Sequence, residues 1–228
     1  MQKPVLIWRV FVFYTIQQIS KPIFKLFPFS IFAVHKIYKD MNTINQNSRT
    51  FLIISMILIA AFARLIPHPW NFTPVAAMAL FGGVYFRNKM MAFAVTILSL
   101  LLSDVLTITF INSSFTNVPK YLFSLGELSV LIGFIITVII GIAVSRKTTP
   151  LNVIGASLLS SIIFFLITNL AVWNHDPLYP QNISGLISCY VAALPFFRNA
   201  IIGDLFYTGV LFGGFYLARL KFPVLAKG

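Results

Sequence analysis

Beyond Phe51, long apolar runs alternate with short polar connections along the chain. An apolar helix of about 20 residues is long enough to cross the hydrocarbon core of a bilayer. The pattern therefore predicts an all-α, polytopic membrane helix bundle with about six transmembrane helices. A shorter apolar run at 187–197 is expected to form a half helix at the outer surface, because it is too short to cross. The expected spans are 51–66, 72–88, 89–110, 122–145, 151–173 and 198–219.

The second expected span is shorter than the others. A helix over 74–86 would measure about 20 Å, against a hydrocarbon core of about 30 Å. This segment either extends into its flanks and crosses, or forms a re-entrant hairpin. Positive charge favours the crossing, because Lys and Arg then gather on one side of the membrane. That side, predicted to be cytoplasmic and to hold both termini, carries Arg49, Arg87, Lys89, Arg146, Lys147, Arg219, Lys221 and Lys227, whereas the outer side carries Arg64, Lys120 and Arg198.

The composition excludes several classes of protein. Of the 228 residues, 58% are apolar and only 10% are charged, and the mean hydropathy is +0.89. So few polar side chains cannot cover a water-facing surface, which excludes a soluble enzyme, a nucleic-acid-binding domain and a disordered tail. The net charge of +12 comes from basic residues between the apolar runs, where such residues indicate how the helices are oriented in the membrane. Membrane lipids, and no nucleic acid, are therefore the expected partners.

Residues 1–48 differ from the rest of the chain. They mix basic and aromatic residues without a clear period, and they contain no glycine. Two interpretations stay open: a basic, aromatic-rich interfacial helix, or an extension upstream of a true start at Met41. The expected organisation is an N-terminal extension at 1–48, a transmembrane domain at 49–221 and a cytoplasmic tail at 222–228.

Asp104 is an acidic residue in a costly position. It lies roughly 21 Å along the third expected span, beside threonine and serine residues that recur at helical spacing. A carboxylate near the bilayer centre costs about 3 kcal/mol, so it is usually kept to face a cavity or a partner. We interpret Asp104 as a ligand-binding residue. The alternative is a structural ion pair with Arg64.

The last expected span contributes further candidate residues. Arg198 enters it at the outer face, and Asp204 lies almost two turns deeper. Together with Asn169, at the outer end of the fifth span, these residues are expected to converge with Asp104 in one polar pocket. Arg64 and Arg198 would balance charge there or bind an anionic group. Alternatively, the Arg198 side chain extends to the lipid headgroups.

Candidate residues at the outer ends of the helices each have two interpretations. Glu127 begins the fourth span, where the helix dipole alone favours an acidic residue, and it is also a candidate ligand contact. One Pro-rich outer loop carries Trp70 and Asn71, and a second carries Trp173 and Tyr179. Aromatic residues at this depth often anchor a protein at the membrane interface. The functional alternative is a lid whose rings cover a flat ligand.

Four blocks of sequence resemble a family of small, uncharacterised bacterial six-helix integral membrane proteins. The blocks are 62–83, 99–104, 160–173 and 189–213, and the resemblance covers about 51–220. The family implies multi-pass location in the bacterial inner membrane, the cell membrane.

A more distant resemblance is to the substrate-binding S components of energy-coupling factor (ECF) vitamin transporters. It rests on the order of a first helix, a Pro-kinked outer loop, a short helix ending in Gly-Gly at 82–83 and a helix ending in Ser-Asp at 103–104. The resemblance implies a vitamin-like small-molecule ligand in an outer pocket roofed by loops, with coupling and ATPase subunits as partners. The first helix departs from that family, because it has no Ala-xxx-Ala pair for docking the coupling subunit.

These observations favour a small-molecule binding and transport protein with a polar pocket in the outer half of the bilayer. One alternative is a scaffold or assembly subunit whose buried charges only determine helix packing. Another is a membrane-embedded enzyme that acts on lipid head groups and needs a divalent ion. His68, His175 and Asp176 lie on two loops without the spacing typical of a metal site. We therefore expect no metal, no cofactor and no catalytic residues.

Overall fold

The computed structural model describes residues 47–66, 69–110, 122–222 and 225. The regular elements in these ranges are helices, which confirms the predicted all-α class. The expectations for the N-terminal extension, and for His68, Lys120 and Lys227, lie outside the described residues. The helices are Asn47–Ala63, α3 (Val75–Tyr85), α4 (Lys89–Phe110), α6 (Leu125–Val144), α7 (Pro150–His175) and α8 (Ile183–Lys221).

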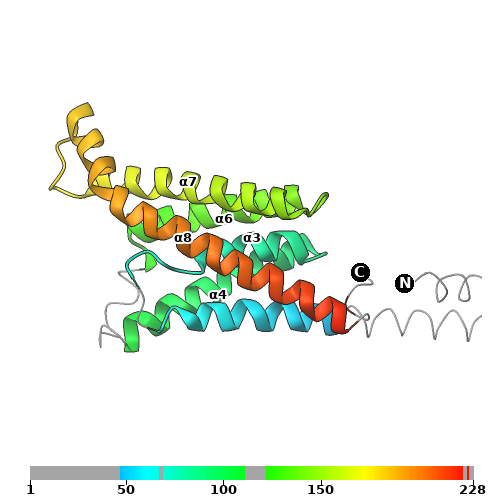
Figure 1. Ribbon diagram of the computed structural model, residues 1–228. Coiled ribbons are helices and arrows are strands. Elements are labelled where there is room, and N and C mark those ends of the chain that lie inside the picture. The colour runs from blue at the N-terminus through cyan, green and yellow to red at the C-terminus, as the bar shows by residue number, and fades with distance from the viewer. Residues whose placement is uncertain (1–46, 67–68, 111–121, 223–224, 226–228) are drawn as a thin grey trace, which may run out of the picture. The chain divides into compact units, whose positions relative to one another are not determined.

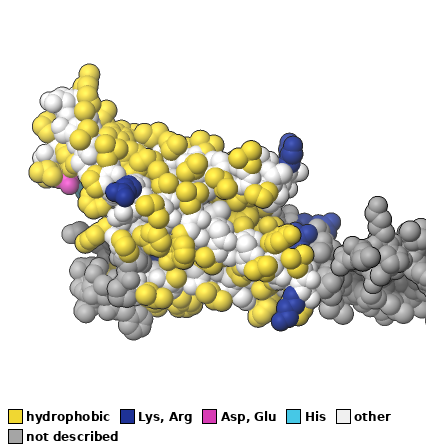
Figure 2. All heavy atoms as spheres, in the orientation of Figure 1, with side chains coloured by type: hydrophobic (Ala, Val, Ile, Leu, Met, Phe, Trp, Pro, Cys, Tyr) yellow, Lys and Arg dark blue, Asp and Glu magenta, His cyan; other side chains and the backbone are white. Residues whose placement is uncertain are grey.

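Four of these helices, α4, α6, α7 and α8, are long and apolar enough to cross a membrane. Large apolar side chains on them point outward, among them Leu98, Ile139 and Leu166, which are about half or more exposed. Figure 2 shows apolar side chains over much of the visible surface of the bundle. An apolar exterior of this extent is expected where lipid replaces water as the surroundings. The helices therefore support the membrane class that the composition predicted.

The short helix α3 lies inside the bundle. All residues from Val75 to Val84 are buried, and α3 packs against α4, α6, α7 and α8 (Figure 1). A helix that is apolar all round is typical of such an interior position. Its close approach to α6 depends on glycine, because a Cβ at Gly141 would lie 2.6 Å from the Leu80 carbonyl oxygen.

The second expected span is one helix and not a hairpin. Asn71 and Thr73, just before α3, line a cavity together with the C-terminal part of α7. Tyr85, the last residue of α3, lies instead beside Pro150 at the start of α7. The segment that enters α3 therefore lies toward one end of the bundle and Tyr85 toward the other, while the 11 residues of α3 itself measure about 16 Å.

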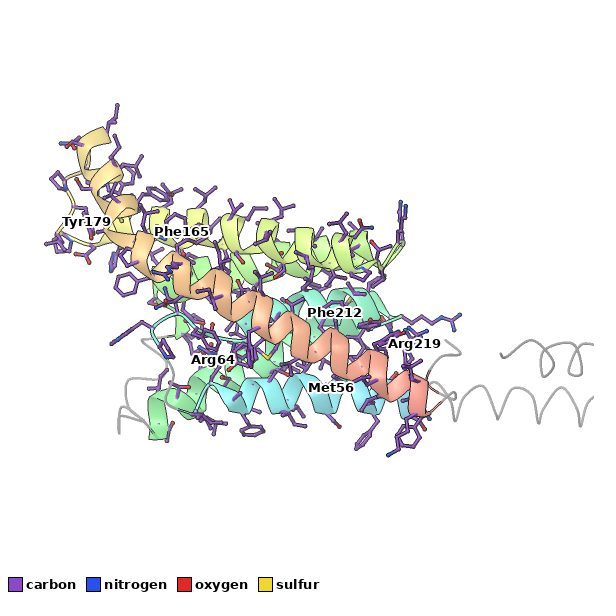
Figure 3. The ribbon with its side chains drawn as sticks, in the orientation of Figure 1. Met56, Arg64, Phe165, Tyr179, Phe212 and Arg219 are labelled. Atoms are coloured by element: carbon purple, nitrogen blue, oxygen red, sulfur yellow. The ribbon has the colours of Figure 1, made fainter. Side chains whose placement is uncertain are left out.

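Basic residues gather at one end of the bundle (Figure 2). There the Arg49 guanidinium donates a hydrogen bond to the Tyr85 carbonyl at 3.4 Å and is close enough to Arg219 for their charges to interact. We call this the basic end. The opposite end, which carries segments 69–74 and 176–182, is called the loop end. Figure 3 shows Arg219 and Tyr179 toward these two ends.

Helix α8 corrects one expectation. The half helix at 187–197 and the last span at 198–219 form one continuous helix, Ile183–Lys221, with Pro195 inside it. Proline lacks a backbone N–H and displaces the preceding turn, so it bends a helix without always ending it. Figure 1 shows α8 changing direction in its first, orange part. Arg198, the first residue of the expected last span, lies within this helix and is exposed.

Candidate functional site

Asp104 is held by an ion pair. Its side chain is 2% exposed, and Arg64 Nη1 donates to Asp104 Oδ1 at 2.6 Å. The same nitrogen donates to Ser103 Oγ at 3.1 Å, and Ser103 Oγ donates to the Ala61 carbonyl at 3.2 Å. These bonds join α4 to the end of the Asn47–Ala63 helix. The structural ion pair that the sequence left as an alternative is therefore present.

Apart from Ser103, the serine and threonine side chains beside Asp104 bond within their own helix. Ser99 Oγ donates to the Val95 carbonyl at 2.7 Å, and Thr107 Oγ1 donates to the Ser103 carbonyl at 2.8 Å. Hydroxyls that bond to the preceding turn in this way need no partner on another helix. These side chains therefore do not indicate a separate polar site.

Asp204 has a different environment. It lies on α8, is 6% exposed, and accepts a hydrogen bond from Ser161 Oγ of α7 at 2.6 Å. Further toward the basic end, the hydroxyls of Ser157 and Thr208 are 3.3 Å apart across the same two helices. These four buried residues form a strip of polar contacts, which we call the α7–α8 polar seam.

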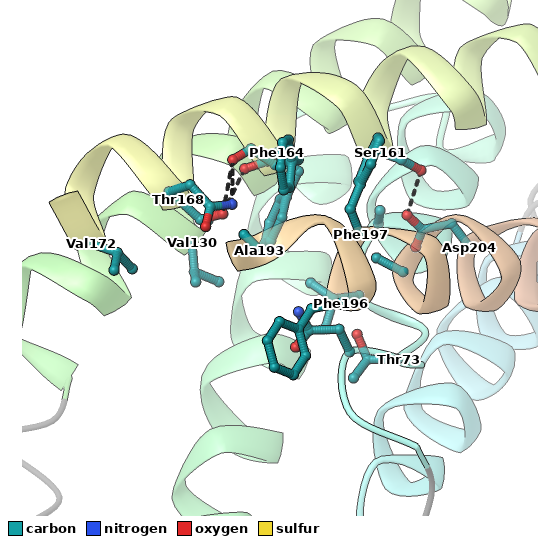
Figure 4. Close-up of a pocket in the computed structure, with 16 residues that line it drawn as sticks. Thr73, Val130, Ser161, Phe164, Thr168, Val172, Ala193, Phe196, Phe197 and Asp204 are labelled. Carbon is teal, nitrogen blue, oxygen red and sulfur yellow. Dashed lines mark hydrogen bonds between the residues drawn. The ribbon is translucent and has the colours of Figure 1, made fainter. Parts of the chain in front are cut away.

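A cavity of about 300 Å³ lies beside Asp204 at the loop end of the seam (Figure 4). It opens among the segment before α3 and helices α6, α7 and α8. Its polar lining includes Asn71, Ser161, Asn169 and Asp204, and aromatic and aliphatic side chains form the rest. A mainly apolar pocket with a few converging polar groups is the usual form of a small-molecule site. The aromatic lining residues are Phe164, Phe165, Phe196 and Phe197.

The segment before α3 is attached to α8 beside this cavity. Asn199 Nδ2 donates to the Trp70 carbonyl at 3.2 Å. The Phe72 ring lies 5.6 Å from the Tyr207 ring, measured between centroids. Gly203 permits this approach, because a Cβ there would lie 3.0 Å from the Phe72 Cα. Asn71, with φ of 62°, turns the chain between these contacts.

The structure brings only some of the predicted site residues together. Asn71, Asn169 and Asp204 line the cavity. Asp104 was expected to converge with Asp204, but it is not among the residues that line this cavity. Asp104 is held between α4 and the end of the Asn47–Ala63 helix, whereas Asp204 is held between α7 and α8. The candidates that are not among the lining residues are Arg64, Trp70, Asp104, Glu127, Trp173, Tyr179 and Arg198.

Those other candidates have local environments of their own. Trp70 is 79% exposed. Trp173 Nε1 donates to the Pro180 carbonyl at 3.0 Å, which braces the connection that contains Tyr179. Glu127 lies in the first turn of α6, where its backbone N–H is capped by Ser124 Oγ at 3.1 Å. Within the described residues, no three His, Cys, Asp or Glu side chains are grouped as metal ligands.

Sequence reasoning did not identify Ser157 and Ser161 as parts of the seam. Their signal is nevertheless readable: Ser157, Ser160 and Ser161 recur at three- and four-residue spacing within an apolar helix, and all three are buried. Polar residues on one face of a transmembrane helix usually face another helix. The four phenylalanines that line the cavity, which we call the aromatic wall, have no comparable signal, because phenylalanine is common throughout the chain.

A larger groove of about 780 Å³ lies at the basic end, between α7 and α8, with Tyr85 of α3 beside it. Its lining is mostly apolar, and Thr208 of the seam is part of it. The polar seam therefore separates the cavity at the loop end from the groove at the basic end.

Apolar helices of spanning length, an apolar exterior and an internal cavity with a buried carboxylate define an α-helical membrane protein with a candidate small-molecule site. The protein-family model described as "Family of unknown function (DUF6580)" matches residues 44–225, and the chain belongs to this family. No curated protein and no solved structure matches the chain. The comparisons therefore show an uncharacterised family, and they do not show the likeness to S components.

Proposed function

We propose that this protein binds a small molecule in the cavity beside Asp204, as an S-component-like binding and transport protein. The observation that carries the proposal is a buried carboxylate in the cavity wall whose hydrogen-bond donor is a hydroxyl, Ser161, at 2.6 Å. An acidic side chain inside a membrane bundle is costly and usually serves a ligand, an ion or a proton. Asp104 has Arg64 to offset that cost, whereas Asp204 lies beside open volume.

The proposed orientation places the basic end in the cytoplasm. Lys and Arg are enriched on the cytoplasmic side of membrane proteins, and Figure 2 shows them gathered at this end. The cavity then lies in the outer half of the bilayer, and both termini are cytoplasmic. The resemblance to small bacterial membrane proteins and the apolar helices of spanning length support a multi-pass location in the bacterial inner membrane.

Transport needs a route and a source of energy. The α7–α8 polar seam lies between the cavity and the groove at the basic end, so a route between these two helices would pass along its polar side chains. Energy would come from coupling and ATPase subunits. Gly209 and Gly213 of α8 have open space where a Cβ would lie, and small residues of this kind allow another transmembrane helix to approach closely.

Native mass spectrometry of the protein, gently extracted from its own host, tests the binding function. We expect a stoichiometric small-molecule adduct on the wild type, and its loss from an Asp204→Asn variant that is still monodisperse. The control is Asn152→Ala, which removes a side-chain hydrogen bond to the Lys147 carbonyl at the basic end, away from the cavity. An adduct retained equally by all three proteins would remove Asp204 from the site. A wild type that carries only lipids would contradict the binding function.

The second candidate function is a scaffold or assembly subunit. The Arg64–Asp104 ion pair favours it, because this pair joins two helices and leaves Asp104 to a structural role. It predicts that no ligand is found and that variants of the cavity fail by unfolding. Thermal unfolding measured beside the mass spectra separates the two functions.

A further inference from the structure

The formal charge of the cavity lining is negative. Among the 16 lining residues that belong to the described part of the chain, Asp204 is acidic and none is Lys, Arg or His. The two arginines that the sequence offered as anion ligands lie elsewhere: Arg64 is bound to Asp104, and Arg198 is exposed and outside the lining. From this charge and the rings beside it, and resting on the proposed function, we infer that the ligand of the cavity is a small organic cation.

The aromatic wall suits a cation. Phe165 and Phe197 stack with ring centroids 4.3 Å apart, and Phe164 and Phe196 also line the cavity. Figure 4 places the rings of Phe196 and Phe197 on the side of the cavity that α8 supplies. The face of an aromatic ring carries negative potential and attracts ammonium groups. Rings and carboxylate therefore favour the same sign of charge.

An anionic ligand would meet the opposite situation. Bringing a second negative charge beside Asp204, in surroundings where water is scarce, would be opposed by Coulomb repulsion, and none of the described lining residues is basic and able to offset it. A neutral ligand would leave the carboxylate without a charged partner. A cation satisfies the carboxylate and replaces its own lost hydration with ring faces and amide oxygens such as those of Asn71 and Asn169.

The volume limits the size of the ligand. A cavity of about 300 Å³ is at the small end of the range for ligand sites. An ammonium group near Asp204 with a compact apolar or aromatic body among the phenylalanines would fit these dimensions. The class is therefore a compact amine or quaternary ammonium compound.

Three probes of one shape and different charge test this inference on the full chain in detergent. Choline is the cation, 3,3-dimethylbutan-1-ol is its neutral carbon analogue, and 3,3-dimethylbutanoate is an anion with the same tert-butyl body. Isothermal titration calorimetry should show choline binding at least about ten-fold more tightly than either of the others, a difference within reach of one desolvated cation contact.

Variants test whether Asp204 causes the preference for choline over the other two probes. Asp204→Asn should remove the advantage of choline, and Asp204→Glu should retain part of it. Asp176→Asn removes an acidic charge outside the cavity but keeps an oxygen that can accept from the Leu178 N–H, so it should bind choline as the wild type does. If Asp204→Asn does not give monodisperse protein, the three probes on the wild type still decide the inference.

The outcomes also separate this inference from the proposed function. Tighter binding of the neutral or anionic probe, or no saturable binding of choline, overturns the inference that the ligand is a cation. If native mass spectrometry then finds a neutral or anionic adduct, the binding function stands and only the charge of the ligand is rejected. If it finds lipids alone, both fail.

Discussion

Two buried carboxylates of this protein were equivalent candidates in the sequence but have different partners in the structure. Asp104 and Asp204 both lie on long apolar helices, are 2% and 6% exposed, and accept a hydrogen bond of 2.6 Å. The donor to Asp104 is a guanidinium, whereas the donor to Asp204 is a serine hydroxyl. Depth and cost within a helix therefore do not identify a functional acid. The two acids differ instead in their hydrogen-bond partners and in the open volume beside Asp204.

The largest effect is expected where the ion pair is broken. Arg64→Ala would leave Asp104 buried without its cation and should lower the free energy of unfolding by about 3 kcal/mol, as removal of one partner of a buried pair usually does. Thermal unfolding in detergent, followed by circular dichroism, measures the loss. The double variant Arg64→Met with Asp104→Leu is the control and should recover most of the stability, because it leaves no buried charge. A single variant as stable as the wild type would contradict the structural role of the pair.

A smaller effect is expected in the polar seam. Ser161→Ala removes the donor to Asp204 and should cost about 1–2 kcal/mol, since a buried acceptor loses its hydrogen bond. Ser188→Ala is the matched control, because this exposed serine of α8 bonds only to the preceding turn of its own helix, at the Ser184 carbonyl. Equal melting temperatures for the two variants would show that the Ser161 contact adds nothing to stability.

The smallest effect on stability is expected at Asp204, and this prediction distinguishes Asp204 from Asp104 most directly. Asp204→Asn should change the free energy of unfolding by less than about 1 kcal/mol, because the amide oxygen can still accept from Ser161 and a neutral group costs less to bury. Binding of the ligand should nevertheless be lost. Denaturation by heat and titration with choline, carried out on the same preparation, test both parts. Unfolding of this variant would instead assign Asp204 the structural role that we give to Asp104.

Much of the fold is predictable from the sequence. The apolar runs predicted the long helices α4, α6 and α7 within a few residues of their observed bounds. The separate half helix expected at 187–197 was wrong, because α8 continues through Pro195 and through the exposed Arg198. Only the packing of α8 decides that this side chain faces outward.

The candidate site was less predictable. Asn169 and Asp204 were found from the rarity of polar residues in apolar runs, and Asn71 from its place in a Pro-rich outer loop; the structure brings all three to one cavity. Their aromatic neighbours could not be found in this way, because nothing in the sequence distinguishes a phenylalanine that faces a cavity from one that faces lipid.

The sequence by itself determined the membrane class, the position of most helices and the gathering of basic residues at one end. These properties follow from the free energy of transferring side chains between water and hydrocarbon. Each segment contributes to that free energy almost independently of the others. Only the tertiary structure decided that Arg64 meets Asp104 and that Ser161 meets Asp204 beside an open volume. Such pairings depend on which helix faces meet, and those faces are selected by close packing over the whole bundle, with contacts as specific as Gly141 against Leu80.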